Sequence, residues 1–237
     1  MRGTIFTGEK AMALLHVQWL GSVDYTSAWQ YQRELVRQRR EGAVPDTLLL
    51  LEHRPPVITL GRGSHAEHLL VPPQQLERLG IQLVETDRGG DITYHGPGQL
   101  VGYPILDLRQ HERDVHLYLR QLEEVIITAL THFGIVGHRK EGLTGVWVGE
   151  EKIAAIGIKV SHWITMHGFA LNVCPDLSHF DLIVPCGIRD KGVTSVQNLL
   201  GREVTLTEVV PLVVEAFAQV FSLQPAAVPA PVSPVPL

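Results

Sequence analysis

Residues 145–189, GVWVGEEKIAAIGIKVSHWITMHGFALNVCPDLSHFDLIVPCGIR, decide the architecture of this chain. Apolar runs alternate there with short turns, a pattern that predicts consecutive β-strands. Lys152 stands at the start of one run, and Cys186 lies in a Pro-Cys-Gly turn after another. Adjacent strands of this kind bring a thiol and an amine together in a pocket walled by small and apolar side chains. We therefore expect the chemistry of the protein at this pair.

The composition suits one ordinary globular domain, with 237 residues of which 45% are hydrophobic and 19% charged. No apolar run reaches the ~18 residues that a membrane-spanning helix needs, so no membrane association is expected. His16 and Gln18 interrupt the stretch 11–20, which predicts a strand and not a signal peptide. Two cysteines without an export signal do not make a disulfide framework, and we expect a cytoplasmic protein. A net charge of -5 gives no general attraction to nucleic acid.

Hydrophobic periodicity predicts helices and strands on both sides of the quoted stretch. Asp114 and Thr207 are the expected N-caps of the two long later helices. Pro104 lies in a predicted strand and indicates an edge or a bulge. Strands are predicted at 13–20, 46–53, 57–60, 81–85 and 101–108, and helices at 25–40, 73–79, 114–133 and 207–221. This order predicts an α+β or mixed α/β class around one sheet.

The chain divides into three predicted parts. Residues 1–12 show no periodicity and form an N-terminal extension, and residues 13–222 form a single catalytic domain. Residues 223–237 are rich in proline among alanine and valine, which is typical of a flexible tail.

A glycine-rich segment, RGGDITYHGPGQ at 88–99, is the second candidate part of a functional site. Glycine is used where the backbone turns with positive φ or approaches a ligand closely. The segment matches neither GxxxxGK[ST] nor GxGxxG, so a nucleotide site is not expected. Histidines are numerous, yet no HExxH or CxxC is present, and no metal site is expected.

Three separated blocks carry a resemblance to a known family. They are RGGDITYHGPGQLVGYPILDL (88–108), KIAAIGIKV with HGFALNV (within 152–173), and PCGI (185–188). In this order they resemble the lipoyl(octanoyl) transferases, which transfer an octanoyl group from acyl carrier protein to protein lysines in lipoate biosynthesis. The resemblance covers about residues 13–222, and the separation of Lys152 from Cys186, 186 − 152 = 34, fits the family pattern.

The resemblance implies a fold, a catalytic pair and a substrate site. The fold would be similar to the catalytic domain of biotin and lipoate protein ligases, with a mixed, largely antiparallel sheet flanked by helices. Cys186 would be the nucleophile, Lys152 its partner and His95 a possible support. Ala155 departs from the Ser that many relatives carry, and Lys159 matches a basic position outside the pair. The implied substrate-binding residues are Arg88, Gly89, Gly90, Asp91, Ile92, Thr93, Tyr94, His95, Ala155, Ile156, Gly157, Gly168, Phe169 and Ala170.

The chemistry of the pair follows from ordinary acid–base properties. A Cys thiol has a pKa of about 8.5 and a Lys amine about 10.4, and in a dry pocket a neutral amine accepts the thiol proton. The thiolate would attack the octanoyl thioester on the phosphopantetheine of acyl carrier protein. A lysine of a lipoyl domain, in 2-oxoacid dehydrogenase complexes or the glycine cleavage H protein, would then take the octanoyl group. Exchange of a thioester for an amide needs neither ATP nor a metal. Main-chain N–H groups near Cys186-Gly187 or Gly89-Gly90 are candidate oxyanion donors.

Other interpretations remain at this point. Taken singly, Cys186 and Cys174 read as small buried hydrophobes, Lys152 as a solvated charge, and His95 as a partner of loop backbone groups. The fold would also suit an ATP-dependent lipoate or biotin protein ligase. A non-catalytic acyl-protein binding module and a thioester hydrolase are further alternatives.

Overall fold

The computed structural model describes residues 12–187 and 191–226, except for the side chain of Cys186. Within these residues the strands form two sheets. The main sheet has nine strands in the order β12-β1-β2-β6-β10-β9-β8-β7, with β11 paired to β9. The smaller sheet has the order β4-β3-β5. The pairs β1–β2, β1–β12 and β9–β11 are parallel and the others in the main sheet are antiparallel, which confirms the mixed, largely antiparallel class.

The elements cover most of the described residues. The strands of the main sheet are β1 (Ala13–Val23), β2 (Asp46–His53), β6 (Gln99–Ile105), β7 (His138–Lys140), β8 (Leu143–Val148), β9 (Glu151–Ser161), β10 (Ile164–Asn172), β11 (Gly192–Val193) and β12 (Leu223–Pro225). The smaller sheet contains β3 (Val57–Leu60), β4 (Gln82–Glu85) and β5 (Ile92–His95). The α-helices are α1 (Tyr25–Arg40), α2 (Pro73–Arg78), α3 (Val115–Thr131), α4 (Val196–Leu200) and α5 (Leu206–Phe221). Three 3₁₀ turns, η1 (Ala66–His68), η2 (Leu177–Leu182) and η3 (Pro185–Gly187), complete the set.

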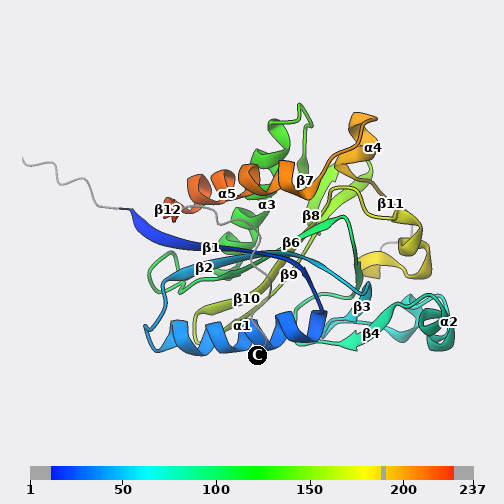
Figure 1. The fold of residues 1–237 in the computed structure, drawn as a ribbon, viewed down its shortest axis with the longest axis horizontal. Coiled ribbons are helices and arrows are strands. Elements are labelled where there is room, and N and C mark those ends of the chain that lie inside the picture. The colour runs from blue at the N-terminus through cyan, green and yellow to red at the C-terminus, as the bar shows by residue number, and fades with distance from the viewer. Residues whose placement is uncertain (1–11, 188–190, 227–237) are drawn as a thin grey trace, which may run out of the picture.

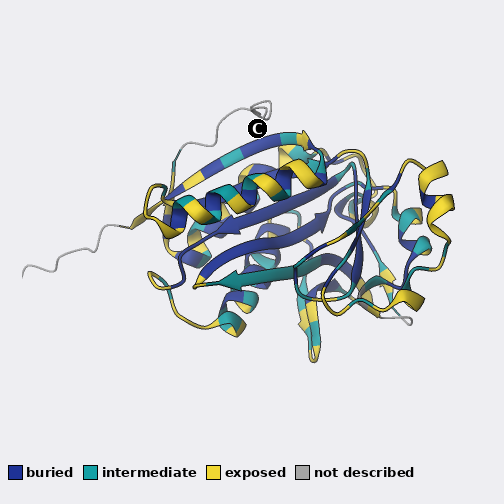
Figure 2. Cartoon of the chain, turned by 90° about the horizontal axis from the view of Figure 1, so that it is seen from below, coloured by how far each residue is buried: buried dark blue, intermediate teal, exposed yellow. Residues whose placement is uncertain are grey.

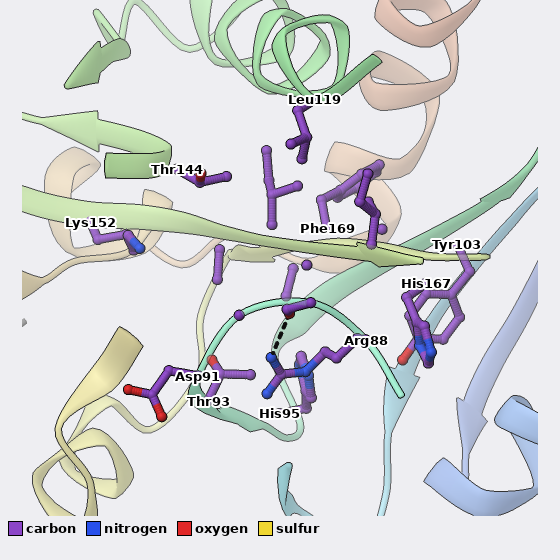
Figure 3. A pocket seen from close by; sticks show the side chains of 18 of the residues that line it. Arg88, Asp91, Thr93, His95, Tyr103, Leu119, Thr144, Lys152, His167 and Phe169 are labelled. Carbon is purple, nitrogen blue, oxygen red and sulfur yellow. Dashed lines mark hydrogen bonds between the residues drawn. The ribbon is translucent and has the colours of Figure 1, made fainter. Parts of the chain in front are cut away.

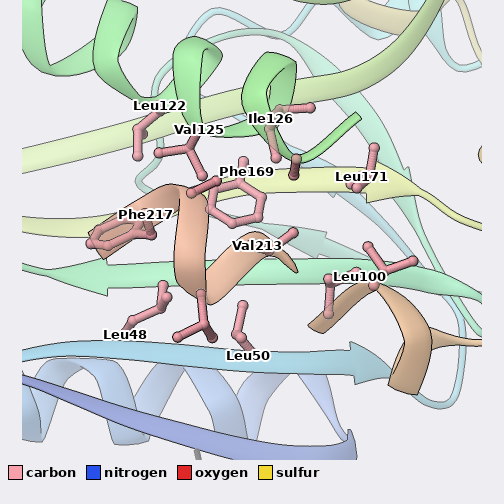
Figure 4. Close-up of a cluster of buried hydrophobic side chains, with 14 of the residues drawn as sticks. Leu48, Leu50, Leu100, Leu122, Val125, Ile126, Phe169, Leu171, Val213 and Phe217 are labelled. Carbon is pink, nitrogen blue, oxygen red and sulfur yellow. The ribbon is translucent and has the colours of Figure 1, made fainter. Parts of the chain in front are cut away.

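Helices cover both faces of the main sheet, with α1 on one side and α3 and α5 on the other (Figure 1). Apolar residues at helical spacing on α3 and α5 face the sheet and form the larger core. Phe169 of β10 lies in this core with Val125 of α3 and Phe217 of α5 (Figure 4). The buried stripe of α1 packs on the opposite face, where Ala28 and Leu35 belong to a second cluster of buried apolar side chains. The other side of α1 is exposed (Figure 2).

Pro104 lies in a central strand, so the edge alternative of the prediction of an edge or a bulge is wrong. β6 pairs with β2 on one side and β10 on the other. The β6–β10 ladder stops at the pair Gly102–Phe169, and its continuation would place Pro104 opposite His167, whose φ is +59°. The missing N–H of proline therefore falls where the ladder is interrupted, which is the reason that a central strand tolerates it. The Pro104 carbonyl accepts a hydrogen bond from Thr165 Oγ1 at 2.7 Å instead.

Several local predictions are confirmed and others need correction. Asp114 caps α3, as predicted. The N-cap of α5 lies two residues earlier than predicted, because Thr205 and not Thr207 caps the helix, in a capping box with Glu208. Residues 92–95 of the glycine-rich segment form β5, and residues 138–140 form β7, neither of which was predicted.

The chain termini test the predicted domain boundaries only in part. Residues 1–11 of the predicted extension and 227–237 of the predicted tail lie outside the described residues. Residues 223–225, placed in the tail by their composition, form β12 beside β1 instead. Backbone pairing to an existing strand orders this short segment despite Pro225, because proline is tolerated on an edge strand.

The capping box of α5 predicts a difference between two neighbouring threonines. Thr205→Ala removes the side-chain acceptor of Glu208 N, and we expect a loss of about 1 kcal/mol in the free energy of unfolding. Thr207→Ala, inside the helix, is the matched control and should cost clearly less. Urea unfolding of both variants measures the difference, and equal losses would contradict the cap at Thr205.

Candidate functional site

A register shift between β8 and β9 decides on which face of the sheet Lys152 lies. Val146 pairs with Ala154 and Trp147 pairs with Lys152, so Ile153 is one extra residue in β9. Ile153 and Ala154 both lie in the core beneath the helices. Lys152 lies on the opposite face, where it lines a small pocket together with Ala155, Thr93 and Gln99. Without the extra residue, strict alternation would direct Lys152 into the apolar core.

Lys152 is almost completely buried, with 6% of its surface exposed. Its Nζ lies 5.0 Å from the centre of the Trp147 ring. Gly145 gives room for the amine, because a Cβ at that position would lie 3.1 Å from Lys152 Cε. The amine is thus held in a confined, largely apolar environment with an aromatic face beside it.

The turn that carries Cys186 lies beside Lys152. Pro185, the preceding residue, lines the same small pocket as Lys152. Gly187, the following residue, has φ of +72° and lies against Asp91 and His68. After the undescribed residues 188–190, β11 pairs in parallel with Glu151 and Lys152. The turn η3 therefore packs against β5 and lies near Lys152 at the start of β9, while the side chain of Cys186 lies outside the described residues.

A cavity of ≈ 320 Å³ is lined in part by Lys152. Figure 3 shows Arg88, Asp91, Thr93 and His95 on one side of the central strands, and Leu119 and Thr144 on the other. Of the predicted site residues, those that line it are Arg88, Gly89, Gly90, Asp91, Thr93, His95, Lys152, Ala155, Ile156, Gly157, Gly168, Phe169 and Ala170. Three segments far apart in the sequence thus meet at one cavity.

Among the predicted site residues whose side chains are described, Ile92 and Tyr94 do not line the cavity. They alternate with Thr93 and His95 along β5, so their side chains point to the opposite face. There they pack in a separate apolar cluster with Ile58 and Phe180. Their role in the described structure is to hold β5 against η2.

The cavity reaches both faces of the sheet because the outer edge of β9 is open in its middle. Pairing with β8 ends at Ala154, and the next contact on this edge is the hydrogen bond from Gly89 N to Ile158 O, 2.8 Å long. Gly157 permits this close approach, since a Cβ there would lie 2.9 Å from Gly89 O. The glycine-rich segment is thereby fixed against β9 at one end of the opening.

Two further histidines, His167 and His53, lie at the polar end of the cavity. His167 lines it and donates a hydrogen bond from Nε2 to the Asp87 carboxylate at 2.8 Å. His53 is buried behind it and bonds Tyr103 Oη at 2.7 Å and the Val23 carbonyl at 3.0 Å. Burial lowers the pKa of each of these histidines to about 4. Burial raises the pKa of Asp87, but hydrogen bonds with Lys159 and His167 outweigh it and lower that pKa to about 2.

No sequence motif marks this polar group. Asp87 precedes the RGG block by one residue, and His53 ends a predicted strand, but neither position carries a spacing signal. Lys159 is near the predicted site in the sequence, and its Nζ donates a hydrogen bond of 2.5 Å to Asp87 Oδ2.

Two features are absent from residues 12–187 and 191–226. No helix in them is long and apolar enough to cross a membrane. No three His, Cys, Asp or Glu side chains in these ranges lie together as a metal ion would require.

The buried histidines predict a loss of stability in mild acid. Their folded-state pKa of about 4 lies below the ordinary value of about 6.5, so the unfolded chain binds more protons between these two pH values. The free energy of unfolding should therefore fall as the pH drops from about 6.5 to about 4. Urea unfolding at about pH 7.5 and about pH 5 measures the loss, and His53→Gln should reduce it. A stability independent of pH in this window would contradict the burial of neutral histidines.

Comparisons with known proteins agree with this architecture. Residues 24–218 match the family model of the lipoyl protein ligase A/B catalytic domain. An octanoyltransferase of Chloroflexus aggregans is 52% identical over 217 residues, which cover 90% of this chain and 98% of the relative. An octanoyltransferase of Rubrobacter xylanophilus is 54% identical over 215 residues, covering 90% of this chain and 96% of that one.

Solved structures of low sequence identity share the fold. A lipoate-protein ligase A bound with ATP has a TM-score of 0.76 at 18% identity, covering 89% of this chain and 87% of that one. A biotin protein ligase from Aquifex aeolicus has a TM-score of 0.51 at 16% identity, covering 87% and 69%. These likenesses confirm the predicted ligase-like sheet flanked by helices. The chain has this sheet, and it is more than 50% identical to relatives over most of its own length and of theirs. It therefore belongs to the lipoyl protein ligase A/B catalytic domain family.

Proposed function

We propose that this enzyme transfers an octanoyl group from octanoyl-acyl carrier protein to a lysine of a lipoyl domain, through a thioester on Cys186. The chain is an octanoyltransferase of protein lipoylation, like the relatives that share half of its residues. One observation carries the proposed mechanism: buried Lys152 lies in the same small pocket as Pro185, which precedes Cys186. This neighbourhood supports the proposed pair, because the turn that carries Cys186 lies near a residue 34 positions earlier in the sequence (186 − 152 = 34).

The first half-reaction loads the enzyme. The amine of Lys152 takes the thiol proton of Cys186, and the thiolate attacks the carbonyl carbon of the octanoyl thioester. The tetrahedral intermediate collapses with cleavage of the bond to the phosphopantetheine sulfur. Lys152 returns the proton to the departing thiolate, which leaves octanoyl-Cys186 and a free phosphopantetheine thiol.

The second half-reaction forms the amide. The ε-amine of the lipoyl-domain lysine attacks the thioester carbonyl carbon, and Lys152 takes a proton from the attacking nitrogen. The bond to Cys186 Sγ breaks, and the thiolate regains a proton from Lys152. Because an amide is more stable than a thioester, we propose that the reaction requires no ATP and no metal.

Two of the candidate oxyanion donors are already engaged. Gly89 N donates to Ile158 O at 2.8 Å, and Gly187 N donates to Val184 O at 3.0 Å. Because each N–H already donates to a carbonyl, neither is available to the oxyanion of the intermediate. We therefore propose other main-chain N–H groups of these turns as its donors.

The cavity supports an acyl chain of medium length. Its volume of ≈ 320 Å³ lies at the lower end of the range of about 300–1,000 Å³ for small-ligand pockets. Ile156, Phe169 and Leu143 provide apolar walls on the helix side. Burial of an octanoyl chain, at about 0.8 kcal/mol per methylene, supplies roughly 5 kcal/mol of binding free energy.

The proposed partners follow from these half-reactions. The enzyme takes an acyl carrier and a lipoyl domain as its two protein substrates. We propose the lipoyl domains of 2-oxoacid dehydrogenase complexes and the glycine cleavage H protein as the acceptors, in the cytoplasm. A protein that instead activates lipoate or biotin as an adenylate would show ATP–pyrophosphate exchange driven by the free acid.

Covalent loading tests the role of Cys186. Incubation with octanoyl-acyl carrier protein, without ATP and with a metal chelator, should add one octanoyl mass to the protein. Cys186→Ala should abolish the adduct, whereas Cys174→Ala, the matched control at the other cysteine, should retain it. Intact-protein mass spectrometry measures the adduct, and labelling that survives Cys186→Ala would exclude the proposed intermediate.

Substitution of Lys152 tests the proton transfer. Lys152→Met keeps a long unbranched side chain without the amine, and we expect both half-reactions to slow by about 10²–10⁴-fold. Lys159→Met removes an amine from the same strand and should have a much smaller effect. Single-turnover rates of loading and of transfer measure this, and unchanged rates in Lys152→Met would remove the amine from the mechanism.

A further inference from the structure

A chain of buried hydrogen bonds connects the backbone beside Lys152 to the ring of His95. Thr194 N donates to Lys152 O at 3.0 Å. The Thr194 carbonyl accepts from Asn172 Nδ2 at 3.0 Å, and Asn172 Oδ1 accepts from Gln99 Nε2 at 2.9 Å. Gln99 Oε1 then lies 2.7 Å from His95 Nδ1. The four residues Thr194, Asn172, Gln99 and His95 are each less than about a tenth exposed.

The Thr194 carbonyl determines which group donates and which accepts in each side-chain hydrogen bond that follows. A carbonyl oxygen only accepts, so the Thr194 carbonyl requires the NH₂ group of Asn172. The Asn172 oxygen then requires the NH₂ group of Gln99, which also reaches the Tyr94 carbonyl at 3.3 Å. The Gln99 oxygen is left facing His95, and an oxygen without hydrogen requires a proton on Nδ1. His95 is thereby held in its Nδ1–H tautomer.

The other ring nitrogen faces the cavity. His95 lines the cavity. Some side-chain nitrogen and oxygen atoms of the described residues are fully buried and have no hydrogen-bond partner, and His95 Nε2 is not one of them. Tyr25 stacks on the ring at 6.2 Å and His53 meets it edge-on at 5.7 Å, which fixes the ring plane. Burial, with a smaller contribution from His53, lowers the pKa of His95 well below its ordinary value, so the ring is neutral. A neutral Nδ1–H ring presents a lone pair at Nε2.

We propose that Gln99 and Asn172 are positioning residues that hold His95 as a hydrogen-bond acceptor for the amine of the incoming lysine. This inference rests on the proposed function. An attacking primary amine has two N–H groups, of which one gives its proton to Lys152 and the other is stabilised by a hydrogen-bond acceptor in the cavity. His95 Nε2 accepts this second N–H and directs the nitrogen lone pair toward the thioester carbon. His95 takes no proton, and the chemistry of the amide-forming step is unchanged.

The same hydrogen-bond chain aligns the two groups with each other. It starts at the main chain of Lys152 and ends at the ring of His95, so the base and the acceptor belong to one rigid frame. The hydrogen bonds require the Nδ1–H tautomer of His95 whether their role is structural or positioning. The tautomer therefore tests the frame, and the rate of transfer to the incoming amine separates the two roles.

Nitrogen NMR of the substrate-free protein, labelled with ¹⁵N at histidine, tests the frame directly. In the wild type we expect His95 to carry its proton on Nδ1 and none on Nε2. Gln99→Glu keeps an acceptor at the same place and should keep this tautomer. Gln99→Leu removes the acceptor and should lose it, whereas Gln38→Leu, a control on α1 that bonds only Glu34, should not. A proton on Nε2 in the wild type would overturn the proposal without reliance on any variant.

Kinetics test the role at the amine. Starting from preformed octanoyl-enzyme, Gln99→Leu should slow transfer to the lipoyl domain roughly tenfold, the effect of one hydrogen bond, and should slow loading less. Equal slowing of both half-reactions, or no slowing of transfer, would overturn the proposed role. Failure of the wild type to form octanoyl-Cys186 would instead overturn the proposed function and with it the amine role, while the NMR result still decides whether Gln99 sets the tautomer.

Discussion

The extra residue in β9 is the constraint on which the site depends. Strands alternate strictly, so a single inserted residue moves every later side chain to the other face. With Ile153 inserted, Ile153 and Ala154 both enter the helix-side core, and Lys152 emerges on the face that carries Ala155 and the turn of Cys186. The dense core beneath α3 and α5 fixes this register, because a slip would bury an amine among leucines and valines.

The surroundings of Lys152 are largely apolar, and the polar groups near them form specific hydrogen bonds. Lys152 is enclosed by an aromatic ring and a glycine, and the histidines near the cavity are buried and neutral. In such surroundings developing charges interact strongly, which supports the proposed proton transfer between the thiol and the amine. The charged groups nearby, such as Asp87 with Lys159, are paired with each other at the edge of the site.

Local rules succeeded where the deciding partners are neighbours in the sequence. The long helices, most strands and the Asp114 cap follow from periodicity and from side chains within a few residues. The same rules failed where two local solutions compete, as at Thr205 and Thr207, since both are threonines near the start of the same helix. Ile92 and Tyr94 belong to a motif block that lines the cavity, yet half of a strand must face away from any one site.

The sequence by itself determined the family, the class of fold and the two residues on which the chemistry is proposed to depend, because these are carried by residue type and by spacing along the chain. Only the tertiary structure decided on which face Lys152 lies, which residues of the motif blocks reach the cavity, and in which tautomer His95 is held. Those features arise from strand register and from hydrogen bonds such as that of Gln99 with Asn172, whose partners are distant in sequence. Spacing along a chain does not encode such pairings; the packing of the core selects them.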